Sequence, residues 1–206
     1  MTRIAIVGTG KMGQGLAAGW TRKSHTVVLA SRDPAARADR VADLEGVRLA
    51  GIADALEEAE VVVIAIPFRA VEPFAREHAA QLRGKLAIDI SNPFDLLPDN
   101  RIAGAEVTAA AIGPGARLVA AFKDTFARTL AEPVDPRGIV RDVHFAGDDA
   151  QDKLLVARLI EDLGFHPVDC GALLNARVLD LMVTLMIELD GRYAGGARTS
   201  SWKLLV

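Results

Sequence analysis

Apolar runs and amphipathic segments alternate along this chain. The runs at 4–7, 26–30, 61–66 and 86–90 are rich in β-branched and other aliphatic residues, which is typical of strands buried on both faces of a parallel sheet. Between the first two runs, apolar residues recur every three or four positions, which predicts a helix over 11–20. The alternation predicts an α/β protein with a Rossmann-type, doubly wound, mostly parallel sheet.

The later part of the chain continues the alternation. Further strands are predicted at 47–49, 117–122, 142–146 and 165–169, and further helices at 52–58, 71–82, 108–112 and 149–163, with a short helix ending near 131. Loops are expected at 95–104 and 132–138. A long helix at 172–189 has apolar positions around much of its circumference, as helices that pack against a partner subunit often have. We therefore expect one Rossmann domain over 1–170 and a C-terminal helical extension over 171–206.

A glycine-rich turn joins the first predicted strand to the first helix. Gly8, Gly10 and Gly13 fit the pattern G-x-G-x-x-G in this strand-to-helix context. In this pattern the first glycine allows a tight turn, the second leaves the backbone open to a pyrophosphate, and the third lets the helix pack close to the strand. Free N–H groups and the helix dipole then favour the phosphate. Dinucleotide binding is predicted here, and the alternative is a glycine turn kept for packing.

Ser31 and Arg32 follow the second predicted strand, where NAD-binding folds usually carry an acidic residue for the ribose 2′-hydroxyl. A hydroxyl and a guanidinium suit a 2′-phosphate, because arginine pairs with phosphate through two hydrogen bonds. We therefore expect NADP(H) rather than NAD(H). Asp33 argues the other way, since a shift by one residue would place a carboxylate near the ribose. Arg37 is a further candidate for the phosphate, with an ordinary surface arginine as the alternative.

The ends of later strands are expected at the same edge of the sheet, because the carboxyl ends of parallel strands face the cofactor crevice. Ile66, Pro67 and Phe68 follow the third apolar run and are expected beside the cofactor, although Phe68 would equally fit the core. Asn92 follows the next strand and either binds the nicotinamide ribose or amide, or starts the turn there. Ala127, in the short helix, completes the predicted cofactor contacts.

Composition and charge exclude several classes of function. A net charge of −3 without any cluster of Lys and Arg argues against a nucleic-acid partner. Cys170 is the only cysteine, which excludes an internal disulfide and a cysteine metal cluster and fits a cytoplasmic protein. The chain enters a strand at once, and no apolar run reaches the ~20 residues of a membrane span. We therefore expect neither a signal peptide nor a membrane segment.

Residues that other enzymes use for acid–base or metal chemistry are scattered or missing. The four histidines do not show metal-ligand spacing, so no metal site is predicted. Tyr193 is the only tyrosine, and Ala197 stands four positions later, where short-chain dehydrogenases carry a lysine. A small dinucleotide domain without an evident general acid suits hydride transfer between two cofactors, in which the protein mainly positions two rings. No catalytic residue is predicted.

Several segments of the chain resemble the NADPH-dependent F420 reductases, that is, the F420H2:NADP oxidoreductase family. The cytosolic domain of the STEAP ferric reductases is similar to the same family. The segments that carry the resemblance are 8–16, 31–32, 66–68, 145–149, 171–177 and 202–205.

The resemblance implies how the cofactors bind. NADP(H) would bind through Thr9, Lys11 and Met12 at the phosphates and through Ser31 and Arg32 at the 2′-phosphate. The deazaflavin F420 would stack against the nicotinamide in a mostly apolar pocket, and hydride would pass directly between the rings. The family also implies a homodimer formed through the C-terminal helix.

One segment departs from the family. Many relatives carry an Ala-Phe-Asn-Thr-like sequence after the sixth strand, where this chain has Lys123 and Asp124 after Phe122. The two charges would lie near the hydride-transfer pocket, and with Thr125 and Trp202 they are the candidate substrate contacts. Lys123 would pair either with a substrate phosphate or carboxylate, or locally with Asp124.

The second substrate is therefore left open at this point. F420 is the expected hydride acceptor. The alternatives are a flavin, an imine or carbonyl compound, or another anionic small molecule. A protein of another class, a non-catalytic NADP(H)-binding sensor, would also fit the residues.

Overall fold

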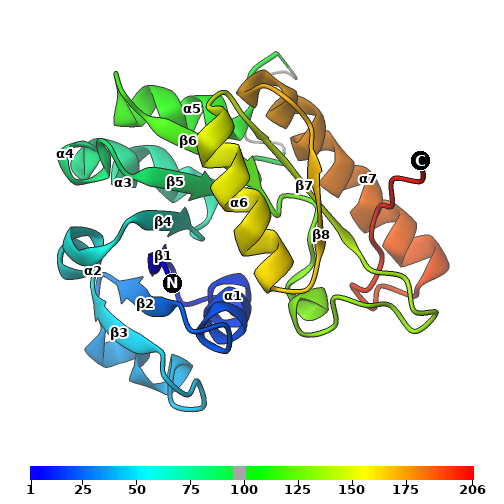
Figure 1. Cartoon of the computed structure of the whole chain (residues 1–206), viewed down its shortest axis with the longest axis horizontal. Coiled ribbons are helices and arrows are strands. Elements are labelled where there is room, and N and C mark those ends of the chain that lie inside the picture. Colours follow the sequence, from blue (N-terminus) through cyan, green and yellow to red (C-terminus); the bar gives the residue numbers. More distant parts are fainter. Residues whose placement is uncertain (95–100) are drawn as a thin grey trace.

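Eight strands form one central sheet in the computed structural model, which describes residues 1–94 and 101–206 (Figure 1). Their order across the sheet is β3-β2-β1-β4-β5-β6-β7-β8. The strands are β1 (Arg3–Val7), β2 (Thr26–Ser31), β3 (Arg48–Gly51), β4 (Val61–Ile64), β5 (Leu86–Asp89), β6 (Arg117–Ala121), β7 (Asp142–Gly147) and β8 (His166–Asp169). Strands β1 to β6 are parallel, β7 is antiparallel to β6, and β8 is parallel to β7. The predicted Rossmann-type, mostly parallel fold is confirmed.

Helices cover both faces of this sheet (Figure 1). They are α1 (Lys11–Thr21), α2 (Ile52–Glu58), α3 (Val71–Glu77), α4 (Ala79–Leu82), α5 (Gly104–Ile112), α6 (Ala150–Asp162) and α7 (Ala176–Tyr193). Helices α1 and α6 pack on one face, and α2 to α5 with the start of α7 pack on the other. The central strands are therefore buried on both sides, which explains their continuous apolar runs. None of the described helices combines the length and apolar character needed to cross a membrane.

Two predicted helices differ from the structure in extent. The predicted helix 71–82 is two helices, because His78 adopts φ/ψ of −105°/16° and separates α3 from α4. The helix predicted at 108–112 begins earlier, at Gly104. Its first turn is stabilised by the side chain of Glu106, which accepts a backbone hydrogen bond of 2.7 Å from the residue before the helix.

Other predicted segments are also adjusted. Of the loop expected at 95–104, residues 95–100 lie outside the described part of the chain. The short helix that ends at Ala131 is a 3₁₀ turn, Ala127–Ala131. The long final helix begins with another 3₁₀ turn, Leu173–Asn175, and continues as α7 beyond its predicted end. The periodic pattern thus located these elements correctly and missed their exact ends.

Two buried carboxylates hold the tail that follows α7. Asp190 accepts backbone hydrogen bonds from residues 198, 199 and 200 at 2.9 to 3.0 Å and another from the Ser200 hydroxyl at 2.8 Å. Asp142, the first residue of β7, pairs with Lys203 at 2.5 Å and accepts the backbone N–H of Leu204 at 2.7 Å. These bonds hold the tail against the start of β7 and the end of α7.

The hydrogen bonds that Asp190 accepts from the tail should make the stability of the protein depend on pH in the acid range. Burial raises the pKa of Asp190, but the hydrogen bonds from the tail outweigh it and lower the pKa to about 2. The pKa of an aspartate in an unfolded chain is ~4. The stabilisation is therefore present above that pH and is lost as the pH falls towards 2. Asp190→Asn should therefore melt at a lower temperature than the wild type at neutral pH. Between pH ~4 and pH 2 it should lose less stability than the wild type does.

Thermal unfolding at a series of pH values measures this difference. Asp43→Asn is the control, since Asp43 is exposed and should leave the wild-type pH dependence unchanged. If Asp190→Asn lost as much stability at acid pH as the wild type, the stabilising role of the Asp190 carboxylate would be contradicted.

Candidate functional site

The glycine turn after β1 has the geometry that its sequence predicts. Gly8 has a φ of +122°, and a Cβ atom at this position would lie 2.3 Å from the carbonyl oxygen of Ala65. A Cβ atom on Gly13 would lie 2.2 Å from the carbonyl oxygen of Gly8, so α1 packs directly on the turn. At Gly10 no described atom lies within 4 Å of the corresponding position. The turn therefore requires glycine at 8 and 13, and Gly10 leaves space open before the N-terminus of α1.

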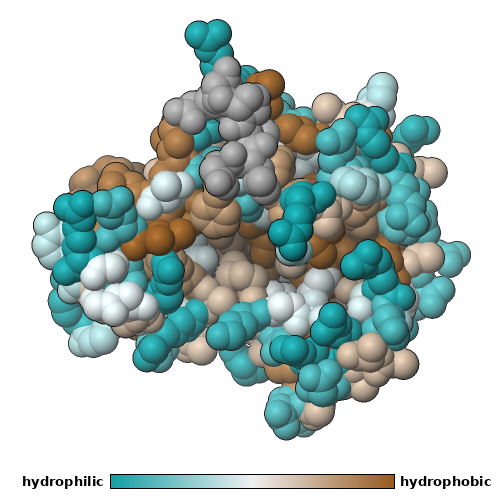
Figure 2. Space-filling view, turned by 180° about the vertical axis from the view of Figure 1, so that it is seen from behind, coloured by the Kyte–Doolittle hydropathy of each residue, from teal (hydrophilic) through white to brown (hydrophobic). Residues whose placement is uncertain are grey.

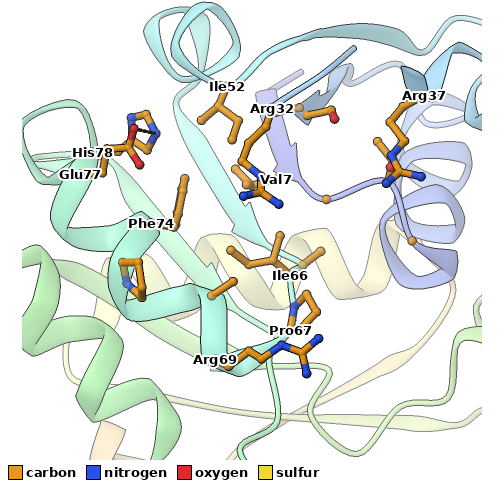
Figure 3. A pocket seen from close by; sticks show the side chains of 18 of the residues that line it. Val7, Arg32, Arg37, Ile52, Ile66, Pro67, Arg69, Phe74, Glu77 and His78 are labelled. Atoms are coloured by element: carbon orange, nitrogen blue, oxygen red, sulfur yellow. Dashed lines mark ion pairs between the residues drawn. The ribbon is translucent and has the colours of Figure 1, made fainter. Parts of the chain in front are cut away.

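A cavity of about 890 Å³ extends from this turn along the carboxyl ends of β1, β2 and β4 (Figure 3). Its volume suits a large cofactor. The predicted cofactor contacts that line it are Gly8, Thr9, Gly10, Ser31, Arg32, Arg37, Ile66 and Pro67. Residues from three strand ends therefore meet where the parallel sheet was expected to bring them together.

Three neighbouring residues at the end of β2, Ser31, Arg32 and Asp33, have different surroundings. Ser31 and Arg32 line the cavity, and Asp33 is not among the described residues that do. Its Oδ1 accepts the backbone N–H of Ala36 at 3.0 Å and so caps the 3₁₀ turn Ala35–Arg40. The carboxylate that argued for NAD(H) thus has a structural partner, and the two residues that line the cavity here carry a hydroxyl and a guanidinium instead.

Sequence reasoning missed the cavity residues that come from α3 and the segments next to it, from the start of α2, and from the 3₁₀ turn after β2. They are Arg40, Ile52, Arg69, Ala70, Pro73, Phe74, Glu77 and His78. A helix that starts shortly after Pro67 must begin at the carboxyl edge of the sheet. The sequence could therefore have indicated that the first residues of α3 lie beside the cavity. Four arginines and one glutamate line the cavity, so its charge favours an anionic ligand.

Other predicted cofactor contacts lie outside the described lining of this cavity. Lys11 and Met12 form the first turn of α1, and Met12 packs against the core. Phe68 packs against Gly104, where a Cβ atom would lie 3.0 Å from its ring. Ala127 begins the 3₁₀ turn after β6. Their contacts with a cofactor stay predictions.

Lys123 follows β6 and is fully buried, and it contacts both α7 and the segment after β5. Its Nζ lies 2.9 Å from Oδ1 of Asp180 in α7 and donates a hydrogen bond to the carbonyl of Ser91 after β5. Its own carbonyl accepts a hydrogen bond of 2.8 Å from the side chain of Asn92. Of the two alternatives for Lys123, the local pair with Asp124 is therefore wrong, because the ammonium group pairs with Asp180 in α7. The buried carboxylate of Asp180, far away in sequence, could not be identified as its partner from local spacing.

Asp124 pairs with a histidine instead. Its Oδ2 lies 2.7 Å from Nδ1 of His144 on β7, and both side chains are buried. Burial alone would lower the pKa of His144, but the hydrogen bond and the charge of Asp124 raise it above its ordinary value. Thr125 and Trp202 lie outside the described lining of the cavity, and the Trp202 indole donates to the carbonyl of Met182 at 3.3 Å. The substrate roles of these residues stay predictions.

The sheet order, the glycine turn and the edge cavity define a Rossmann-type α/β protein with a crevice where this fold binds dinucleotides. Residues 3–93 match the family model described as NADP oxidoreductase coenzyme F420-dependent. The F420-dependent NADP reductase of Methanothermobacter marburgensis is 30% identical over an alignment of 211 positions, which covers 91% of this chain and 92% of that protein. The chain belongs to this family of F420-dependent NADP reductases.

Two further comparisons agree with this assignment. A crystal structure from Arthrobacter sp. FB24, described as a putative F420 dependent NADP-reductase, superimposes with a TM-score of 0.91 at 27% identity, and all of both chains is covered. Metalloreductase STEAP3 of Rattus norvegicus is 30% identical over 179 residues, which cover 86% of this chain and 36% of that protein. The family expected from the sequence motifs is confirmed.

Proposed function

We propose that this protein transfers hydride between NADPH and the deazaflavin F420, as a homodimer in the cytoplasm. The observation that carries the proposal is similarity to an F420-dependent NADP reductase over 91% of the chain. The cavity supports it, because Ser31 and Arg32 stand where a 2′-phosphate would lie. A single cysteine, whose pKa is raised by burial, fits a reducing compartment.

NADP(H) would lie along the edge cavity. Thr9 and Gly10 precede α1, whose free N–H groups would hold the pyrophosphate. The guanidinium of Arg32 would pair with the 2′-phosphate, and Ile66 and Pro67 would contact the cofactor from the side of β4. The bound cofactor supplies the hydride, and the protein positions the two rings.

This chemistry requires no general acid among the side chains. The hydride carries its electron pair from the dihydronicotinamide to the deazaflavin, and water supplies the balancing proton. The buried Lys123, Asp124 and His144 all have partners within the protein, which agrees with structural roles for them. What the site has to provide is a fixed distance between two flat rings.

A single assay tests the proposed reaction and its alternatives. Purified protein, NADPH and F420 should give a loss of the visible absorption of F420 that depends on both protein and NADPH, and NADH should be a poor substitute. FMN or riboflavin in place of F420 should be reduced far more slowly. An equal or faster rate with the flavins would indicate a flavin reductase. NADPH binding without turnover of any acceptor would indicate a sensor.

The exposed surface of α7 and of the 3₁₀ turn before it supports the dimer. Leu174, Val178, Leu181 and Leu185 are spaced by four, three and four residues and are each 45 to 56% exposed. Such spacing places apolar residues along one side of a helix. Figure 2 shows apolar side chains at the surface on the side of the molecule that carries α7. A second copy presents the same stripe, so a twofold contact between the two α7 helices would cover both.

Charges in this stripe should prevent the dimer. The double variant Leu181→Glu with Leu185→Glu should be monomeric, because two buried carboxylates per subunit would face each other. Light scattering coupled to size-exclusion chromatography measures the mass. Leu154→Glu, on the exposed side of α6 at 52% exposure, is the matched control and should leave the dimer intact. A monomeric wild type, or a dimer that survives both charges, would contradict this interface.

A further inference from the structure

Glu77 and His78 close one end of the cavity, beyond Arg32 and Ile52 (Figure 3). The ring of His78 packs against Phe74, with the ring centroids 5.1 Å apart and the planes at 46°. The end of the cavity therefore combines apolar side walls with two polar side chains. Such a site can hold a flat heteroaromatic ring by its faces and recognise its edge.

The polar side chains at this end both present hydrogen-bond acceptors. Nδ1 of His78 lies 2.7 Å from Oε1 of Gln81, whose Nε2 faces the carbonyl of Ala53 at 3.4 Å. An amide oxygen only accepts, so Nδ1 of the neutral ring carries the proton and Nε2 is an acceptor. Oε1 of Glu77 lies 4.0 Å from this Nε2, and an ionised carboxylate also only accepts.

The two side chains differ in freedom. His78 is held in place by Gln81 and Phe74, and its side chain is 13% exposed. The side chain of Glu77 is 75% exposed and can rotate to meet a ligand. One fixed and one adjustable acceptor can therefore receive the two hydrogens of a single amino group.

The proposed binding mode brings the adenine of NADP(H) to this end. One ribose carries the pyrophosphate, the 2′-phosphate and the base. With the pyrophosphate at Gly10 and the 2′-phosphate at Arg32, the base extends away from the glycine turn, towards Phe74 and His78. The amino group of adenine lies on the edge that would meet the two acceptors.

We propose that His78 and Glu77 select the base of the cofactor by accepting hydrogen bonds from the 6-amino group of adenine. This inference rests on the proposed binding of NADP(H). It adds that the protein rejects dinucleotides with a 6-oxo base, such as the hypoxanthine analogue of NADPH. A 6-oxo group is itself an acceptor, so it would face the fixed Nε2 of His78 with no hydrogen between them, and this largely buried acceptor would be left without a donor.

Binding of the two dinucleotides tests the inference. The wild-type protein is titrated with NADPH and with its hypoxanthine analogue, without any hydride acceptor, and dihydronicotinamide fluorescence reports binding. The analogue should bind at least about tenfold more weakly than NADPH. The ratio of the two dissociation constants is the quantity to compare among variants.

Two variants change the acceptors and keep the shape of the site. Glu77→Gln supplies an amide donor to the 6-oxo group, and His78→Phe keeps a ring against Phe74 without an acceptor. In both, the ratio should fall towards one, and Glu77→Gln should also bind the analogue more tightly than the wild type does. Glu72→Gln is the control, since Glu72 pairs with Arg76 at 2.7 Å on the same helix and should leave the ratio unchanged.

The outcomes separate this inference from the proposed function. Equal affinity of the wild type for both dinucleotides, or an unchanged ratio in both variants, overturns the base selection and leaves the NADP(H) site standing. If neither dinucleotide binds, the NADP(H) site fails and the inference fails with it. The assay contains no F420, so an error in the identity of the hydride acceptor does not affect it.

Discussion

Asp180→Ala should unfold about 10 °C below the wild type, because it leaves the charge of Lys123 buried without a partner. Lys123 is completely buried, and the Asp180 carboxylate 2.9 Å away is its counter-charge. Removing one partner of such a pair costs about 3–5 kcal/mol of unfolding free energy. The same carboxylate also accepts the backbone N–H of Gly104 at 2.8 Å, at the start of α5. Thermal unfolding followed by circular dichroism measures the loss.

The intact pair should nevertheless contribute little net stability. Burial raises the pKa of Asp180, although the charge of Lys123 and the N–H of Gly104 oppose this. The double variant Lys123→Met with Asp180→Leu should therefore recover most of the stability that Asp180→Ala loses. Glu72→Ala, which breaks the exposed pair with Arg76, should cost at most about 1 kcal/mol. An Asp180→Ala variant as stable as Glu72→Ala would contradict the buried pair.

Arg32→Ala should raise the KM for NADPH by about 10- to 100-fold and leave the KM for NADH nearly unchanged. Arg32 lines the cavity beside Ser31, while Asp33 caps the 3₁₀ turn that follows. Only NADPH carries the 2′-phosphate, so only NADPH loses a charge-assisted pair when the guanidinium is removed. Steady-state rates with each dinucleotide and a saturating acceptor measure the two constants.

A matched surface variant controls for net charge. Arg22→Ala removes the same charge from the exposed end of α1, outside the described lining of the cavity, and should change neither constant. Arg37→Ala should have a smaller effect than Arg32→Ala, since Arg37 lies in the 3₁₀ turn further from the strand end. Equal effects of Arg32→Ala on NADPH and NADH would exclude its role at the 2′-phosphate.

Local sequence rules predicted the part of the site that local geometry determines. The positive φ of Gly8 and the close approach at Gly13 follow from a strand, a tight turn and a helix in direct succession. Ser31, Arg32 and Ile66 could be placed at one edge because parallel strands end there. In each case the neighbours that matter are close in sequence or fixed by the fold class.

Contacts between distant segments could not be predicted in this way. Lys123 pairs with Asp180 and Asp124 with His144, and nothing in the spacing of these residues identifies such partners. The break at His78 was missed for a similar reason, since its ring is held by Phe74 and Gln81 rather than by helix periodicity. Tertiary packing determines these features, and single-sequence patterns do not record it.

Transfer of an isotope label tests the central claim most directly. NADPH carrying deuterium at C4 of the dihydronicotinamide is oxidised by the protein with F420 as acceptor, and mass spectrometry of the reduced deazaflavin follows the label. Direct hydride transfer between the stacked rings predicts that deuterium from one face of C4 appears in the reduced F420. Two samples are compared, with deuterium on one or on the other face of C4. Reduced F420 that carries no label from either sample, or no reduced F420 at all, would contradict the proposed reaction.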